Sequence, residues 1–91
     1  RIPTALLNQW LAATISRHPP PLANRKLVKM RYISQYANRP PRFVIFSNRP
    51  KKLPESYRRY LTNELRTSFD FHGVPIRIFL KSGRNPYVKN D

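Results

Sequence analysis

The stretch Leu53-Pro54-Glu55-Ser56-Tyr57-Arg58-Arg59-Tyr60-Leu61 predicts the start of a helix that continues to about Phe69. Pro54 suits a first helical turn, where its missing N–H is not needed, and Glu55 places a carboxylate near the positive end of the helix dipole. Apolar residues recur every four positions and form one stripe, which we expect to enter the core: Tyr57, Leu61, Leu65 and Phe69.

The other flank of this helix is polar and mostly basic, since Arg58, Arg59, Asn63 and Arg66 fall off the apolar stripe. Two interpretations are open for these arginines, because they can be solvated by water or can bind an anion. The helix can therefore cover a sheet with one side while its flank meets a charged partner.

The chain as a whole is strongly basic. Its 91 residues carry 18 lysines and arginines against four acidic residues, which gives a formal net charge of +14. Residues 1–54 hold 11 of the basic residues and none of the acidic ones. A charge this large favours a polyanionic partner, with nucleic acid as the leading candidate. A membrane surface is the weaker alternative, because neither a long basic amphipathic helix nor a lipidation signal is present.

Several other functional classes lack their sequence signals. The chain has no cysteine, no apolar run of the roughly 18 residues that a membrane span needs, and no signal peptide. It has no G-x-x-x-x-G-K-[S/T] phosphate loop, and its few acidic residues are too dispersed for a metal site or an acid–base pair. We therefore predict a small cytoplasmic domain that is not an enzyme and holds no cofactor. Its first residue is Arg1 rather than Met, which suggests a fragment.

A first helix is expected from Pro3 and Thr4 up to the prolines at 19–21. Its apolar spacing is that of one buried helical face, made by Leu7, Trp10, Leu11, Thr14 and Ile15. We expect Trp10 in the core, although an indole ring can also stack on a base.

Three segments, 26–36, 42–47 and 76–81, have the alternation of strands. The segment 42–47 is apolar on both faces, as in a strand inside a sheet. In the first segment, Val28, Met30 and Tyr32 should share one face, and the opposite face should carry Lys29, Arg31 and Ile33.

These elements predict an α+β domain of order α-β-β-α-β, with two helices packed on one face of a three-stranded sheet. The first two strands form a hairpin, and a crossover through the second helix makes the third strand parallel, so the sheet is mixed. The open sheet face is left for a partner and carries Lys29, Arg31, Arg77, Phe79 and Lys81. Phe79 can stack a base there or can be covered by another domain.

The residues just before the second helix are a candidate phosphate site. Arg49, Lys51 and Lys52 precede the helix N-terminus, where backbone N–H groups and positive charge favour an anion. Together with Arg58 and Arg59 they form the predicted RNA-binding set. The alternative is an exposed basic loop without a ligand.

Several blocks, in this order and at this spacing, resemble the C-terminal KH-like domain of the bacterial EngA (Der) GTPases. They are Arg1-Ile2-Pro3-Thr4, Leu7-Asn8, His18-Pro19-Pro20-Pro21, Arg39-Pro40-Pro41, the stretch from Leu53 to Leu61, Phe71-x-Gly73-x-Pro75-Ile76-Arg77 and Arg84-Asn85-Pro86-Tyr87. The resemblance covers residues 1–87 and leaves 88–91 as a C-terminal tail.

The resemblance implies a KH-like fold and a parent protein with two tandem GTPase domains, which are absent from this chain together with their GTP, GDP and Mg sites. It also implies a role in biogenesis of the large ribosomal subunit, with contact to ribosomal RNA. The competing interpretation is an interaction module that docks on the parent's GTPase domains and relays their nucleotide state. In that case the docking surface is the open, basic sheet face described above, which includes Arg77, Phe79 and Lys81.

One departure from ordinary KH domains affects how RNA would be held. Those domains clamp a nucleic-acid backbone with a Gly-x-x-Gly loop. The only glycines in this chain are Gly73 and Gly83, so the loop is missing. Residues 49–54 occupy its position, where Lys51 and Lys52 offer side-chain charge, which favours phosphate contact over base reading.

Overall fold

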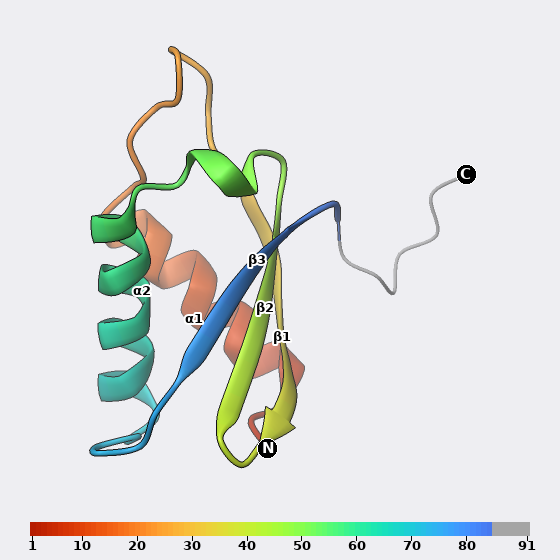
Figure 1. The fold of residues 1–91 in the computed structure, drawn as a ribbon, viewed down its shortest axis with the longest axis vertical. Helices are drawn as coiled ribbons and strands as arrows, with labels where there is room; N and C mark the ends of the chain where they lie inside the picture. Colours follow the sequence, from red (N-terminus) through yellow and green to blue (C-terminus); the bar gives the residue numbers. More distant parts are fainter. Residues whose placement is uncertain (85–91) are drawn as a thin grey trace.

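The computed structural model describes residues 1–84 and has an α+β architecture (Figure 1). The elements follow in the order α1 (Thr4–Arg17), β1 (Met30–Asn38), β2 (Pro41–Ser47), the 3-10 helix η1 (Pro50–Lys52), α2 (Glu55–Ser68) and β3 (Arg77–Ser82). The predicted α-β-β-α-β order is confirmed. The predicted domain end at residue 87 and the tail at 88–91 lie outside the described residues.

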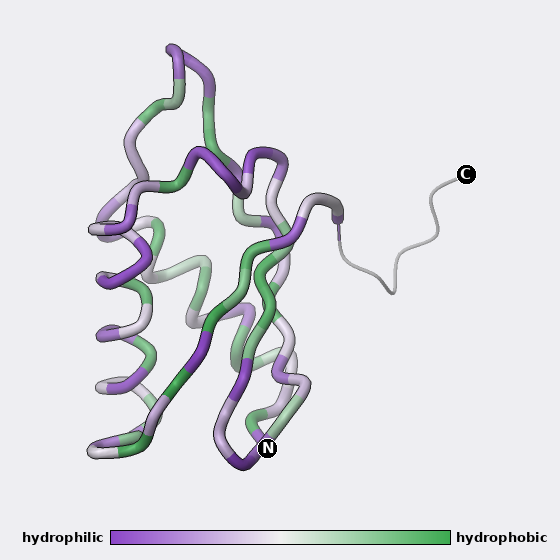
Figure 2. The backbone as a smooth tube through the Cα atoms, in the orientation of Figure 1, coloured by the Kyte–Doolittle hydropathy of each residue, from purple (hydrophilic) through white to green (hydrophobic). Residues whose placement is uncertain are grey.

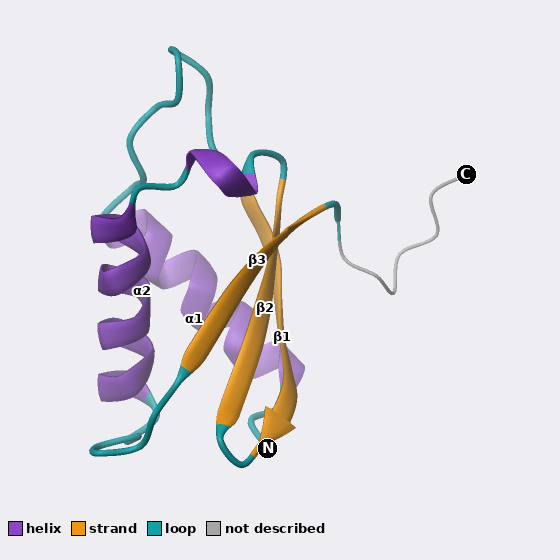
Figure 3. Cartoon of the chain, in the orientation of Figure 1, coloured by secondary structure: helices purple, strands orange, loops and turns teal. Residues whose placement is uncertain are grey.

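The sheet has the strand order β1-β2-β3 (Figure 3). β1 is antiparallel to β2, and β3 is parallel to β2, so the sheet is mixed as predicted. Residues of both helices join one core with Ile33, Phe43 and Ile45, which places α1 and α2 on the same face of the sheet.

The predicted helix stripes are confirmed as the core faces. In α2, Tyr57, Leu61 and Leu65 are buried, and Phe69 is half-buried at the helix end. In α1, the buried residues are Leu7, Trp10, Leu11 and Thr14. The indole N–H of Trp10 donates to the Ser68 hydroxyl at 3.1 Å. Trp10 is therefore a core residue that joins the two helices.

The first strand begins later than predicted, at Met30 rather than at residue 26. Ala23 and Lys26 exchange both backbone hydrogen bonds at 2.9 Å, around Asn24 and Arg25 at φ values of 52° and 67°. Two successive residues with positive φ form the tight turn that is typical of a hairpin. Residues 23–26 are thus a turn in the loop that projects beyond the sheet in Figure 1.

A bulge in β1 corrects the predicted faces of this strand. Met30 pairs with Ser47, whereas Tyr32 pairs with Phe46, so the register shifts by one residue between them. Ile33 is consequently fully buried beneath the helices, and the Tyr32 ring lies 6.4 Å from the Phe46 ring on the open face. The prediction was wrong for both residues, because one extra residue in a strand inverts the alternation that follows it.

The outer edge of β1 is bound by a side chain of α1. The Asn8 amide oxygen accepts from the Ile33 N–H at 2.9 Å, and its amide nitrogen donates to the Ile33 carbonyl at 3.0 Å. A side chain thus satisfies two edge groups that would otherwise be open to another strand. This contact fixes α1 against the sheet.

The turn between α2 and β3 is held by an arginine. The Arg66 guanidinium donates to the Phe71 carbonyl at 3.1 Å and also to the Val74 carbonyl. Gly73 in this turn has a φ of 70°, a conformation that glycine adopts without steric cost. Arg66 is therefore engaged in the fold and is not free to bind an anion.

Tyr57 connects α2 to the end of α1 through a cluster of rings. Its hydroxyl donates to the His18 carbonyl at 2.7 Å, and its ring stacks on the His18 ring with centroids 5.8 Å apart. Burial, and secondarily the nearby Tyr60 phenol, raises the pKa of Tyr57 from 10.0 to about 12. The folded state therefore favours the neutral phenol.

We expect this phenol to make the domain sensitive to alkali. Because the pKa of Tyr57 is higher in the folded chain, its contribution to stability is complete below pH 10 and is lost as the pH rises from 10 through about 12. Thermal unfolding across this range should show a smaller loss in Tyr57→Phe than in the unchanged chain. The exposed Tyr36→Phe is the control and should follow the unchanged chain. Coincident curves for the unchanged chain and Tyr57→Phe would contradict this assignment.

Candidate nucleic-acid interface

The junction between β2 and α2 forms a short basic turn. The Arg49 N–H donates to the Ser47 hydroxyl at 3.1 Å, and the Lys52 N–H donates to the Arg49 carbonyl at 3.1 Å, which closes η1. Leu53 is buried and anchors the turn, whereas Lys51 and Lys52 are exposed. The turn is a hydrophilic segment between the sheet and α2 (Figure 2). The fold therefore holds two lysines outward beside the start of α2.

The N-terminus of α2 has no side-chain cap. Pro54 occupies the cap position, and its carbonyl accepts the N–H groups of Tyr57 and Arg58 at 3.1 Å each. The first helical turn also contains Glu55, whose carboxylate opposes an incoming anion at this spot. Phosphate binding is therefore better supported by the flanking cations than by the helix end alone.

A hollow of about 370 Å³ lies between α2 and β3. We call it the α2–β3 groove. Its lining comprises Glu55, Arg58, Arg59, Leu61, Thr62, Asn63, Ile76, Arg77, Ile78 and Leu80. The groove brings Arg58 and Arg59 together with Arg77, which the sequence analysis placed in the docking set and not in the RNA-binding set. Three arginines thus border one groove next to the basic turn.

Arg49, like Arg58, is less exposed than the lysines of the predicted RNA-binding set. It is half-buried, and over residues 1–84 its Nε is a buried polar atom that lacks a hydrogen-bond partner. A buried donor without an acceptor costs free energy. The Nε itself is closed to solvent, so a phosphate contact by Arg49 would use the terminal nitrogens of its guanidinium.

The predicted docking set is only partly brought together. Arg77, Phe79 and Lys81 alternate along β3 and face away from the helices. Lys29 instead precedes β1, where its N–H donates to the Asn48 side chain at 2.7 Å, and Arg31 occupies the bulge. The assignment of Lys29 to a strand was therefore wrong, because the strand starts one residue later.

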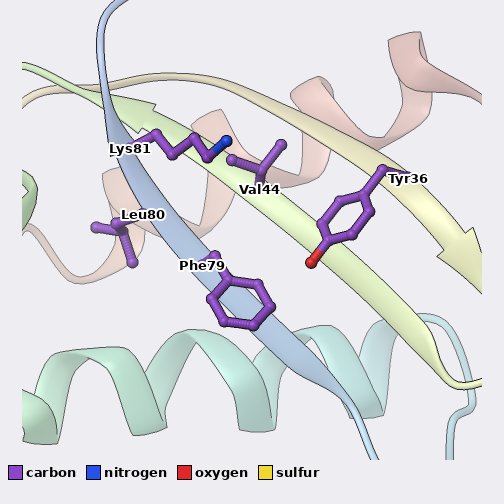
Figure 4. A pocket seen from close by; sticks show the side chains of 5 residues that line it. All are labelled: Tyr36, Val44, Phe79, Leu80 and Lys81. Carbon is purple, nitrogen blue, oxygen red and sulfur yellow. The ribbon is translucent and has the colours of Figure 1, made fainter.

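Sequence analysis placed Phe79 on the open sheet face but missed the tyrosines that share this face with it. The face carries Tyr32, Ser34, Tyr36, Arg42, Val44, Phe46, Arg77, Phe79 and Lys81. A hollow of about 520 Å³ on this face is lined by Tyr36, Val44, Phe79, Leu80 and Lys81 (Figure 4). Alternation along residues 42–47 was a signal for Arg42 and Val44, but placing Tyr36 beside Phe79 required the strand register.

The comparisons with known proteins identify the family. The KH-domain-like family found at the C-terminus of EngA bacterial GTPase enzymes matches residues 1–81. The chain belongs to this family. This chain lacks the Gly-x-x-Gly loop of ordinary KH domains. Between β2 and α2 it has η1, followed by Leu53 and Pro54.

The KH-like domain is similar to part of several proteins named GTPase Der. It is 53% identical over 88 residues to that of Parvibaculum lavamentivorans, 52% over 88 residues to that of Bartonella quintana and 49% over 88 residues to that of Hyphomonas neptunium. Each comparison covers 97% of this chain, but only 19%, 18% and 17% of the respective relative. The chain therefore spans less than a fifth of the length of these relatives.

Residues 1–84 contain no group of three His, Cys, Asp or Glu side chains arranged to hold a metal ion. Within the same residues, no helix has the length and apolar composition that crossing a bilayer requires.

Proposed function

We propose that this KH-like domain binds ribosomal RNA through phosphate contacts, as part of an EngA/Der-type GTPase that acts in the cytoplasm in biogenesis of the large ribosomal subunit. The observation that carries the proposal is the continuity of the basic turn with the α2–β3 groove. Arg49, Lys51 and Lys52 lead directly to the groove that Arg58 and Arg59 line. Phosphate oxygens are the ligands that such guanidinium and ammonium groups bind best.

The charge distribution supports an anionic partner along this path. The acidic residues of the described part are Glu55, Glu64 and Asp70, all in or just after α2. Glu64 pairs with Arg17 at 2.9 Å, and Asp70 lies 3.0 Å from His72. Glu55 is therefore the one carboxylate among these three that lines the groove, against three arginines.

The proposal is tested by the salt dependence of RNA binding. Anisotropy titrations of the 91-residue chain against two unrelated single-stranded RNAs should give similar affinities. Each phosphate contact contributes about 0.7 to the slope of log affinity against log salt, so the four contacts of Lys51, Lys52, Arg58 and Arg59 predict a slope near −2.8, and a fifth contact by Arg49 would make it steeper by about 0.7. Binding without salt dependence, or binding of one sequence alone, would overturn phosphate-based recognition.

The second candidate is docking on the GTPase domains of the parent protein, which would bind GTP or GDP with Mg. The apolar hollow around Tyr36, Val44 and Phe79 favours it, because mixed aromatic and basic surfaces are common in protein interfaces. Association with separately expressed GTPase domains, measured by calorimetry, tests this role. The two roles are compatible if the sheet face is covered by a GTPase domain in one state and open to RNA in another.

A further inference from the structure

The open sheet face carries a pair of exposed aromatic rings whose exposure the fold does not explain. Tyr36 is 46% exposed and Phe79 is 41% exposed, and their ring centroids lie 6.4 Å apart. The Val44 side chain lies between the strands that carry them (Figure 4). These rings form the wall of a hollow that is open to a ligand.

Cations surround this pair of rings. Arg77 and Lys81 flank Phe79 along β3, at intervals of about 6.6 Å for alternate residues of a strand. A second hollow of about 500 Å³ joins the rings to Arg42 and Arg77, and is lined by Tyr36, Pro40, Arg42, Pro75, Arg77 and Phe79. None of the three strands contains an acidic residue. Along β3 a cation, an aromatic ring and a second cation follow one another. This order matches a phosphate, a base and a second phosphate along a nucleic-acid strand.

The face is also continuous with the proposed phosphate site. Arg77 lines both the α2–β3 groove and the hollow beside Phe79, so only strand β3 lies between the two sites. A nucleic-acid strand that leaves the groove can pass over this edge without leaving a basic surface. Aromatic side chains on a sheet commonly stack unpaired bases in this way.

We propose that Tyr36 and Phe79 form a stacking site for one unpaired base of single-stranded RNA, with Arg77 and Lys81 on the flanking phosphates. This inference rests on the proposed RNA-binding function and adds a base contact to it. The stacking site accepts any base, because every base has a π face, and so it adds affinity without reading sequence.

The test uses the 91-residue chain and a labelled single-stranded RNA of about ten nucleotides, within the usual range of site sizes. Phe79→Leu keeps an apolar side chain but removes the π face, and should weaken binding roughly tenfold at fixed salt. The slope against salt should not change, because no charge is removed. Phe79→Tyr is the matched control and should bind like the unchanged chain. Tyr36→Leu provides an independent second variant.

A modified RNA shows whether a base is the occupant. Replacing one nucleotide at a time with an abasic residue should weaken binding to the unchanged chain at one position by a similar factor. The same abasic RNA should bind Phe79→Leu no worse than the complete RNA does. A 2-aminopurine base at that position should lose fluorescence when it stacks.

The outcomes separate the two proposals. If Phe79→Leu and Tyr36→Leu leave RNA affinity unchanged while salt dependence persists, base stacking is overturned and phosphate binding stands. If these variants instead weaken association with GTPase domains alone, the face is a protein-docking surface and the inference is wrong. If the unchanged chain shows no salt-dependent RNA binding, both proposals fail.

Discussion

Replacing Leu61 with alanine is expected to lower the free energy of unfolding by roughly 2–5 kcal/mol, which is the usual cost of truncating a fully buried leucine. Leu61 lies in the middle of the α2 stripe and has no exposed surface, in the same core as Phe43 and Ile45. The backbones of α2 and of the sheet limit how far the surrounding residues can move into the space that the side chain leaves. A cavity should therefore remain. Chemical denaturation with a two-state fit measures the change.

This loss is large for a chain of 91 residues. A small domain has only about 5–15 kcal/mol of net stability, so the variant should melt far below the unchanged chain. Arg59→Ala, two residues earlier on the exposed flank, is the control and should cost well under about 1 kcal/mol. Equal losses in the two variants would contradict the division of α2 into a core face and a solvent face.

The core faces of both helices could be predicted from sequence because they depend on local spacing alone. Tyr57, Leu61 and Leu65 recur at the helical period, and this period survives whatever the helix packs against. The same holds for Leu7 and Trp10 in α1. The parallel direction of β3 could also be predicted, because a helix between two strands of one sheet favours a crossover connection.

The faces of β1 could not be predicted in the same way. A strand alternates with a period of two, so one extra residue at the first bulge exchanges inside and outside for the residues that follow it, up to the second register shift between Gln35 and Ala37. Ile33 and Tyr32 are the residues that this exchange misplaced. Nothing in the local sequence marks the bulge, because it depends on how residues 30–32 pair with the neighbouring strand.

The candidate interface was predictable in its charges but not in its grouping. Lys51, Lys52, Arg58 and Arg59 stand close in sequence, so local geometry was enough to place them together. Arg77 joins them only because β3 returns alongside α2. Tyr36 of β1 lies beside Phe79 of β3 because of the strand register and the bulge. Neither of these can be derived from the composition.

The strongest expected effect on binding is that of removing the two lysines of the basic turn. Lys51→Ala combined with Lys52→Ala should flatten the salt slope by about 1.4, at 0.7 for each contact with single-stranded RNA. The electrostatic part of log affinity scales with the slope times the log of salt concentration, so the loss at about 0.1 M salt is roughly 25-fold. The loss should be similar for unrelated RNA sequences, because phosphate contacts carry no base information.

The fold should tolerate this double change. Both lysines are exposed, and η1 is closed by backbone contacts of Arg49 and by the burial of Leu53. Alanine at both positions leaves these contacts in place, so the melting temperature should stay close to that of the unchanged chain. A weaker RNA complex would then report lost contacts and not lost structure.

A matched control separates local contacts from the effect of net charge. Arg1→Ala with Arg39→Ala removes the same charge from the opposite end of the sheet, where the Arg1 guanidinium makes an exposed hydrogen bond of 3.2 Å to Asn38. This pair should leave the slope almost unchanged, because the described fold places it far from η1 (Figure 1). If both pairs flatten the slope equally, RNA is attracted by the +14 charge as a whole and the basic turn is not its binding site. If only the control pair flattens it, the interface lies at the other end of the domain.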